Sequence, residues 1–351
     1  MRSFADRTGL TSDRPQARYL WTDAFAVCNF LELAHLTGER SYADLARQLV
    51  DQVHHELARY RADDARTGWT SGLGEREGEA HPTRGGLRIG KTLPERRPEE
   101  PLDQQLEWDR DGQYFHYLTK WMHALDQVSG ATGDPRFNFW ARELGEVTHA
   151  AFTRGGRAGR RMVWKMSTDL SRPLVASMGQ HDPLDGLITC AQLETTAALW
   201  PRVVPGPDLR PAVADFATMV DGLDLGTEDP LGLGGLLSDA CRVVQLMARG
   251  TFHDGILLER LLRAAYAGLV HCSQYGDWRQ PPSRRLAFRE LGLAGIERLQ
   301  KNSDEGPLAF GSEKLHAQVH ALDSYVGLRA AIAPSWLEPQ QQRRSIGTST
   351  T

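Results

Sequence analysis

The sequence TGERSY at residues 37–42 is repeated as TGDPRF at residues 132–137, and this repeat decides the fold. The similarity continues at the same offset, because Ala46-Arg47 matches Ala141-Arg142. A glycine in the left-handed conformation ends one helix, an acidic residue begins the next, and an aromatic ring fills the elbow between them. Two copies of one helix-turn-helix elbow predict an architecture of repeated helical hairpins.

Apolar residues return at three- and four-residue intervals along most of the chain, as in helices that bury one face. These segments run over residues 21–36, 42–57, 112–131, 135–152, 184–200, 209–221, 232–249, 255–273, 284–299 and 313–332. Residues 161–166 and 174–178 predict short strands that form one small hairpin. The sequence therefore predicts an all-α fold with a small β-hairpin. We expect a single domain over residues 1–337 and a disordered polar tail at 338–351.

The elbow and its following amphipathic helix resemble those of six-hairpin glycosidase-like proteins. That superfamily folds as an (α/α)6 toroid and includes unsaturated glucuronyl hydrolases, and N-acylglucosamine 2-epimerases use a similar toroid. The helical pattern covers roughly residues 15–335, but the elbow is a stacking motif and no catalytic motif of the family is matched. The resemblance implies a toroid of helical hairpins whose loops line a funnel at one end.

The composition sets limits on compartment and partners. The 351 residues carry a formal net charge of -4, which gives no reason to expect nucleic acid or an anionic membrane as a partner. No run approaches about 18 apolar residues, and the N-terminus lacks the apolar stretch of a secretory signal. The four cysteines lie far apart in the sequence, whereas a metal cluster would need close pairs. We therefore expect them to be buried reduced thiols. We expect a cytoplasmic protein.

Two segments combine carboxylates with aromatic or titratable neighbours, as a sugar site requires. The first, EWDRDGQYFHY at residues 107–117, contributes Glu107, Trp108, Asp109, Tyr114 and His116. The second, QHDPLDG at residues 180–186, contributes His181 and Asp182. Both allow a purely structural alternative, in which Asp109 or Asp111 caps one helix and Asp182 caps another. Trp21 and Asp23, at the start of the first long helix, present the same choice.

A long segment without helical or strand period, residues 61–110, interrupts the helical pattern. It holds Trp69, Arg88 and Lys91, and we expect it to fold over the mouth of the toroid. Residues Gly85–Thr92 match the phosphate-binding pattern GxxxxGK[ST]. Their polar, proline-containing flanks supply neither the strand nor the helix that this motif needs, so no nucleotide binding is expected.

The leading hypothesis is a carbohydrate-active enzyme, similar to glycoside hydrolases or lyases, acting on a sugar or a uronic-acid-containing glycan. Asp109 and Asp182 are predicted to share one pocket as acid and base, with Glu107, Asp23 and His181 as further candidates.

The same hypothesis assigns substrate contacts. Trp21, Trp69, Trp108 and Tyr114 would stack on sugar rings, and Arg88 or Lys91 would meet a substrate carboxylate. No cofactor, metal, membrane or nucleic-acid partner is predicted, and the oligomeric state is left open.

Two alternatives remain open. A sugar isomerase or epimerase on the same toroid would move a proton through His116, His181 or His253. A non-catalytic protein would present the toroid as a ligand-binding or scaffold surface.

Overall fold

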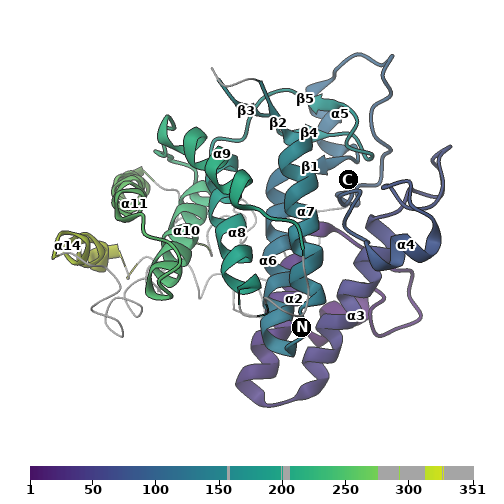
Figure 1. Cartoon of the computed structure of the whole chain (residues 1–351), viewed down its shortest axis with the longest axis horizontal. Helices are drawn as coiled ribbons and strands as arrows, with labels where there is room; N and C mark the ends of the chain where they lie inside the picture. Colours follow the sequence, from purple (N-terminus) through teal and green to yellow (C-terminus); the bar gives the residue numbers. More distant parts are fainter. Residues whose placement is uncertain are drawn as a thin grey trace. The chain divides into compact units, whose positions relative to one another are not determined.

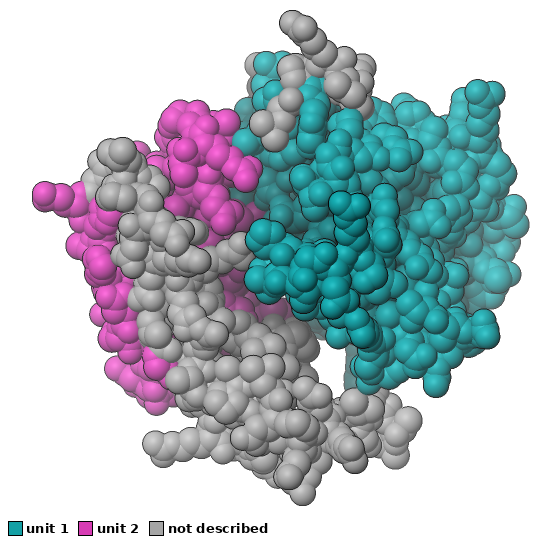
Figure 2. Space-filling model, turned by 90° about the horizontal axis from the view of Figure 1, so that it is seen from below, with its two compact units in different colours: residues 1–222 teal, residues 223–351 magenta. Residues whose placement is uncertain are grey.

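The computed structural model describes residues 1–155, 159–198, 200, 206–275, 292, 313–325 and 327 (Figure 1). The chain is 61% helical with a few short antiparallel strands, so the predicted all-α class with a small β-hairpin is confirmed. It divides into two compact units, residues 1–222 and 223–351, which Figure 2 colours separately. The single-domain toroid therefore remains a prediction.

Helical hairpins make up most of unit 1. Its long helices are α2 (Leu20–Thr37), α3 (Arg40–Leu57), α6 (Phe115–Thr132), α7 (Arg136–Phe152), α8 (Asp182–Ala197) and α9 (Arg210–Asp221). The helices α1 (Arg2–Arg7), α4 (Glu75–Ala80) and α5 (Gln104–Asp109) are short. The pairs α2–α3, α6–α7 and α8–α9 are the packed hairpins, with α2 also against α6 and α6 against α8.

The repeated elbow has the same chemistry in both copies. Gly38 and Gly133 end α2 and α6 with φ of 72° and 69°, the left-handed region that favours glycine. The hydroxyls of Thr37 and Thr132 then accept hydrogen bonds from the backbone N–H two residues on, at 3.2 and 3.3 Å. The acidic residue differs between the copies, because Glu39 makes no side-chain cap on α3, whereas Asp134 accepts the Arg136 N–H at the start of α7 at 3.0 Å.

Helices α6 and α8, the first helices of two successive hairpins, run parallel. His116 lies beside Asp182, and Lys120 binds Asp185 one turn further along both helices. The N-terminal ends of α6 and α8 therefore lie together. Parallel packing of the first helix of each hairpin is compatible with the inner ring of an α/α toroid.

Part of the predicted hairpin is present and a third strand joins it, although residues 161–162 of the predicted first strand pair elsewhere. β4 (Lys165–Met166) pairs antiparallel with β5 (Pro173–Val175) and with β1 (Gln113–Tyr114). Because residues 113 and 114 pair with β4, α6 begins at Phe115 and not at residue 112 as the periodicity predicts. A separate pair, β2 (Thr153–Arg154) with β3 (Arg161–Met162), follows α7.

The segment 61–110 packs against the N-terminal end of α2 and the residue that precedes β1. The Leu20 N–H donates to Ile89 O at 3.0 Å, and the Ile89 N–H donates to Gly112 O at 2.8 Å. The Arg88 N–H donates to Leu57 O at the end of α3. The middle of this segment therefore lies at the same end of the hairpins as the starts of α2 and α6.

Unit 2 contains α10 (Pro230–Ala248), α11 (Gly255–Tyr275), α14 (Glu313–Ala321) and the 3-10 turn η3 (Leu322–Tyr325). Helix α10 is the one described helix long and apolar enough to cross a membrane, and 56% of its apolar window is buried, including Leu233, Leu237 and Val244. The tail at 338–351 and, apart from residue 292, the predicted helix at 284–299 lie outside the described residues.

Candidate functional site

Seven aromatic side chains gather where α2 and α6 begin, and we call them the aromatic cluster. Its members are Tyr19, Trp21, Trp108, Tyr114, His116, Tyr117 and Trp164. Each ring has its centroid within about 6 Å of another member, the range in which aromatic pairs attract. The cluster draws on segments that lie far apart in the sequence.

Two structural features assemble the cluster. Packing of α2 on α6 brings Trp21 within 5.0 Å of Tyr117 and 5.9 Å of His116, measured between ring centroids. Pairing of β1 with β4 brings Trp164 within 4.9 Å of Tyr114. The predicted contributions of Trp21, Tyr114 and His116 therefore come together in one place.

The cluster is open to solvent on one side. Trp108 is 55% exposed and packs edge-on against Trp164, with ring centroids 4.8 Å apart. The His116 side chain is 25% exposed, whereas Tyr114 is buried beneath it. Partly exposed aromatic rings around a titratable group are typical of ligand sites, since each ring offers an apolar face to a ligand.

Asp182 meets His116 at the edge of the cluster. The Asp182 carboxylate lies 4.0 Å from His116 Nδ1 and accepts a hydrogen bond from the Gly179 N–H at 3.2 Å. Burial and the nearby charge of Asp185 raise the pKa of Asp182 from 3.8 to about 7. Burial lowers the pKa of His116 to about 4. Near neutral pH, Asp182 is thus close to half protonated beside a neutral imidazole.

Asp182 is the first residue of α8, and its N-cap is His181. The sequence predicts Asp182 as the N-cap of α8, whereas in the structure the N-cap is the residue before it. Asp182 still receives the Gly179 N–H, so its carboxylate has a local structural role besides its position next to His116. His181 is half-buried at the helix start.

Two lysines, Lys120 and Lys91, lie near the aromatic cluster. Lys120 donates to Asp185 at 2.6 Å, one helical turn beyond the pair formed by His116 and Asp182. Lys91 lies with its Nζ 5.6 Å from the ring centroid of Tyr19, at cation–π distance. Lys91 therefore remains a candidate for contact with an anionic substituent, as the sequence predicts.

Glu107 has a structural role, because two cations bind its carboxylate. It is 3% exposed, and Lys165 and Arg96 each donate to one of its carboxylate oxygens at 2.9 Å. The Lys165 side chain is itself fully buried and also donates to the Glu107 and Arg110 carbonyl oxygens. Because both carboxylate oxygens are held by cations, Glu107 fixes the end of α5 and is not placed to act on a substrate.

Asp109, predicted to share a pocket with Asp182, is exposed at the end of α5. Two residues along an α-helix turn the side chain by roughly 200°, so burial of Glu107 directs Asp109 to the opposite side. Its charge still acts on Tyr114, which places Asp109 near the outer face of the cluster. Within the described residues, no contact joins it to Asp182.

Arg88 and Trp69 stabilise the long segment. Arg88 is 2% exposed and binds Asp111 at 2.6 Å, with its remaining donors on the carbonyl oxygens of residues 56 and 59. Trp69 is 2% exposed beneath the Arg59 guanidinium. Neither side chain reaches the aromatic cluster, so the predicted sugar contacts of Arg88 and Trp69 are not part of this site.

Asp23 is also buried, next to the aromatic cluster but not open to it. It is 1% exposed and lies 3.8 Å from Arg18, and its other oxygen accepts the Tyr19 N–H at 3.0 Å. Burial raises the pKa of Asp23 to about 6 despite this ion pair. Asp23 therefore positions Tyr19 at the start of α2.

The GxxxxGKT segment is folded into the protein. The N–H groups of Leu87 and Ile89 donate to Gln113 Oε1 and Gly112 O, and that of Gly90 donates to Asp111 Oδ1. A phosphate-binding loop needs these donors for its ligand. The glycines have a packing role, because a Cβ on Gly86 would lie 1.9 Å from Gln113 Oε1.

Sequence reasoning missed Tyr19, Trp164 and Lys120, whereas Tyr117 and Asp185 lie inside the two segments that it singled out but were not assigned to the site. Lys120 follows His116 by four residues and so shares its helical face, a spacing that the sequence already contained, whereas Tyr117 is turned by roughly 100° from His116. Trp164 sits in the predicted hairpin, but only the pairing of β1 with β4 shows where it points.

Within the described residues, no three histidine, cysteine or carboxylate side chains are grouped closely enough to hold a metal ion. Comparison with protein-family models and with curated proteins found no match. The fold and the aromatic cluster are therefore the basis for any functional conclusion.

Proposed function

We propose that this protein is a carbohydrate-active enzyme that binds a sugar ring against the aromatic cluster. The observation that carries the proposal is the placement of Asp182 and His116 at the edge of a partly exposed group of aromatic rings. Sugar rings have apolar faces of C–H groups and polar edges of hydroxyls. Trp21, Trp108 and Trp164 offer the complementary apolar surfaces.

Asp182 supports acid–base chemistry because its pKa of about 7 lies near the physiological pH. Such a group can both donate and accept a proton without a large free-energy cost. His116, kept neutral by its lowered pKa, can exchange hydrogen bonds with a sugar hydroxyl through its ring nitrogens. Asp182 thus supplies the titrating group of the pair and His116 a neutral hydrogen-bonding partner.

The proposal has a hydrolytic and an isomerising form. Hydrolysis uses two carboxylates about 5–10 Å apart across the glycosidic bond, and Asp109 near Tyr114 is the available second acid. Isomerisation or epimerisation uses one base to remove a proton from carbon, and a histidine beside an acid suits that step. Because His116 lies beside Asp182, isomerisation is the second candidate function.

A panel of monosaccharides, oligosaccharides and uronic acids would test the proposal, with binding followed by calorimetry. New reducing ends would indicate hydrolysis, whereas deuterium incorporation from heavy water would indicate isomerisation. His116→Gln and Asp182→Asn should each lower turnover by about a hundredfold or more. Asp13→Asn changes an exposed acid outside the cluster and should have no effect. Full turnover in both site variants, or no sugar binding at all, would refute the proposal.

A further inference from the structure

A shallow depression of about 440 Å³ opens in unit 1, and no member of the aromatic cluster lines it. Two loop segments, residues 70–71 and 84–85, form one side. Val147 and Ala150, from the last turns of α7, also line it. Residues 169–171, from the loop between β4 and β5, complete the lining. The depression is thus a separate candidate site, and a ligand bound there would be independent of the sugar proposed for the aromatic cluster.

Two arginines line this depression, and in the described part of the chain no carboxylate lies at ion-pair distance from either. Arg84 and Arg154 are both exposed, and neither forms an ion pair with any residue in the described part of the chain. The one side-chain contact of Arg154 there is a weak one, 3.9 Å to Met166 Sδ. By contrast, Arg66 binds three carboxylates, those of Asp64, Glu95 and Asp169. The charge of Arg84 acts on the buried Glu143, but neither guanidinium is bound directly by a carboxylate. Two such guanidinium groups lining one depression create a local positive potential.

Backbone donors accompany the arginines. Ser71 and Gly85 both line the depression, and among the described residues no acceptor takes the N–H of either. Their segments are held together, since the Thr70 hydroxyl contacts Gly85 O at 3.3 Å. A Cβ on Gly85 would lie 2.3 Å from Ser71 N, so only glycine permits this approach. Adjacent unsatisfied N–H groups in a concave surface are the usual backbone component of an anion site.

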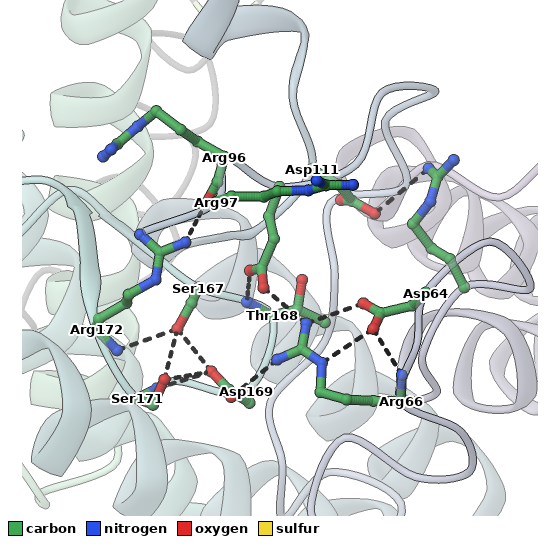
Figure 3. Close-up of polar contacts among 12 residues, drawn as sticks. Asp64, Arg66, Arg96, Arg97, Asp111, Ser167, Thr168, Asp169, Ser171 and Arg172 are labelled. Atoms are coloured by element: carbon green, nitrogen blue, oxygen red, sulfur yellow. Dashed lines mark hydrogen bonds and ion pairs between the residues drawn. The ribbon is translucent and has the colours of Figure 1, made fainter. Parts of the chain in front are cut away.

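The acidic residue of the lining, Asp169, belongs to a group of three carboxylates that share one arginine. Asp169 accepts hydrogen bonds from Arg66 at 2.9 Å and from the Ser167 hydroxyl at 2.7 Å, as Figure 3 shows. Arg66 also binds Asp64 and Glu95, so this side of the depression carries excess negative charge. An anion would therefore be repelled from Asp169 and drawn toward Arg84 and Arg154.

We infer that the depression binds a tetrahedral oxyanion, the phosphate or sulfate group of a small molecule. Each guanidinium can donate two parallel hydrogen bonds to such a group, and two guanidiniums balance a doubly charged anion. Val147 and Ala150 give the lining an apolar surface on which the organic part of the ligand rests.

Inorganic phosphate, sulfate and acetate, titrated at constant ionic strength against the full-length protein, test the inference directly. Saturable binding should appear by calorimetry, and amide resonances of Ser71 and Gly85 should shift with the same dissociation constant. Phosphate and sulfate separate the two sources of the tetrahedral group, and acetate tests for a planar, singly charged alternative.

Arg84→Gln and Arg154→Gln should each weaken binding by about tenfold or more, as expected for loss of a charged hydrogen-bonding partner. Arg40→Gln is the matched control, because Arg40 is exposed at the start of α3 and likewise lacks an ion pair in the described part of the chain. An equal effect of Arg40→Gln would show that net charge alone attracts the anion and would overturn the inference. Acetate binding as tight as sulfate binding, or no saturable binding, would overturn it as well.

Discussion

Replacing Asp182 by asparagine should stabilise the protein at high pH, even though it removes a proposed catalytic group. The pKa of Asp182 rises from 3.8 to about 7 on folding, because the buried site disfavours the charged carboxylate. The folded protein therefore holds a proton that the unfolded chain releases between these two pH values. Stability contributed by this proton is lost as the pH rises through that window.

The size of the effect follows from the two pKa values. Their difference corresponds to a penalty of about 4 kcal/mol once the pH exceeds the folded pKa, at roughly 1.4 kcal/mol for each tenfold change. At about pH 5 the penalty is about 1.5 kcal/mol, and it vanishes near pH 3. Asparagine retains an oxygen for the Gly179 N–H and carries no charge. The gain in the free energy of unfolding should therefore grow with pH up to about 8.

Asp185→Asn is a matched control, for which we expect a decrease and not an increase in the free energy of unfolding. Asp185 lies in the same first turn of α8, but Lys120 donates to its carboxylate at 2.6 Å. Removing this charge leaves Lys120 without its partner and should cost about 1 kcal/mol or more. Urea unfolding followed by circular dichroism at several pH values measures both variants against the wild type. A loss of stability in Asp182→Asn at pH 8, or a gain that does not change with pH, would refute the reasoning.

Three further predictions concern the cluster, a core histidine and the long segment. Trp164→Ala should weaken binding of any sugar ligand by about tenfold in calorimetry, because the ring lies half-exposed in the aromatic cluster. Burial lowers the pKa of His54 to about 3, so the unfolded chain alone takes up a proton below about pH 6.5 and stability should fall with decreasing pH. His54→Gln should reduce that acid sensitivity in urea titrations, and an unchanged pH dependence would contradict it. Gly86→Ala should destabilise the protein by several kcal/mol, since its φ of 72° and the nearby Gln113 leave no room for a Cβ. Gly130→Ala in α6, where nothing lies within 4 Å, should instead raise the melting temperature through helix propensity.

The periodicity predicted the helices well because helix formation depends on local spacing of apolar residues. The helices α2 and α3 begin and end within a few residues of the predicted bounds, and the glycine at each elbow takes the left-handed conformation that the motif requires. The start of α6 was predicted too early because strand pairing removes residues 113 and 114 from the helix. That pairing involves a partner some fifty residues away, which no local pattern contains.

Burial separated the candidate acids in a way that composition could not. Glu107, Asp109 and Asp111 lie within five residues and look equivalent in the sequence. The structure buries Glu107 against Lys165 and Asp111 against Arg88, and exposes Asp109. Each cation comes from a distant segment, so the choice between an anchored and an available carboxylate is a tertiary property. The sequence accordingly overestimated how many of these acids are free to react.

The sequence by itself determined the helical class, the hairpin elbows and the density of aromatic and acidic residues near 107–117 and 180–186. Those features depend on interactions over three or four residues, which the order of amino acids specifies directly. Only the tertiary structure decided that His116 meets Asp182 and that Trp164 joins Tyr114. These contacts depend on the packing of parallel helices and on strand register. Their free energies are shared among many residues and cannot be assigned to any single stretch of the chain.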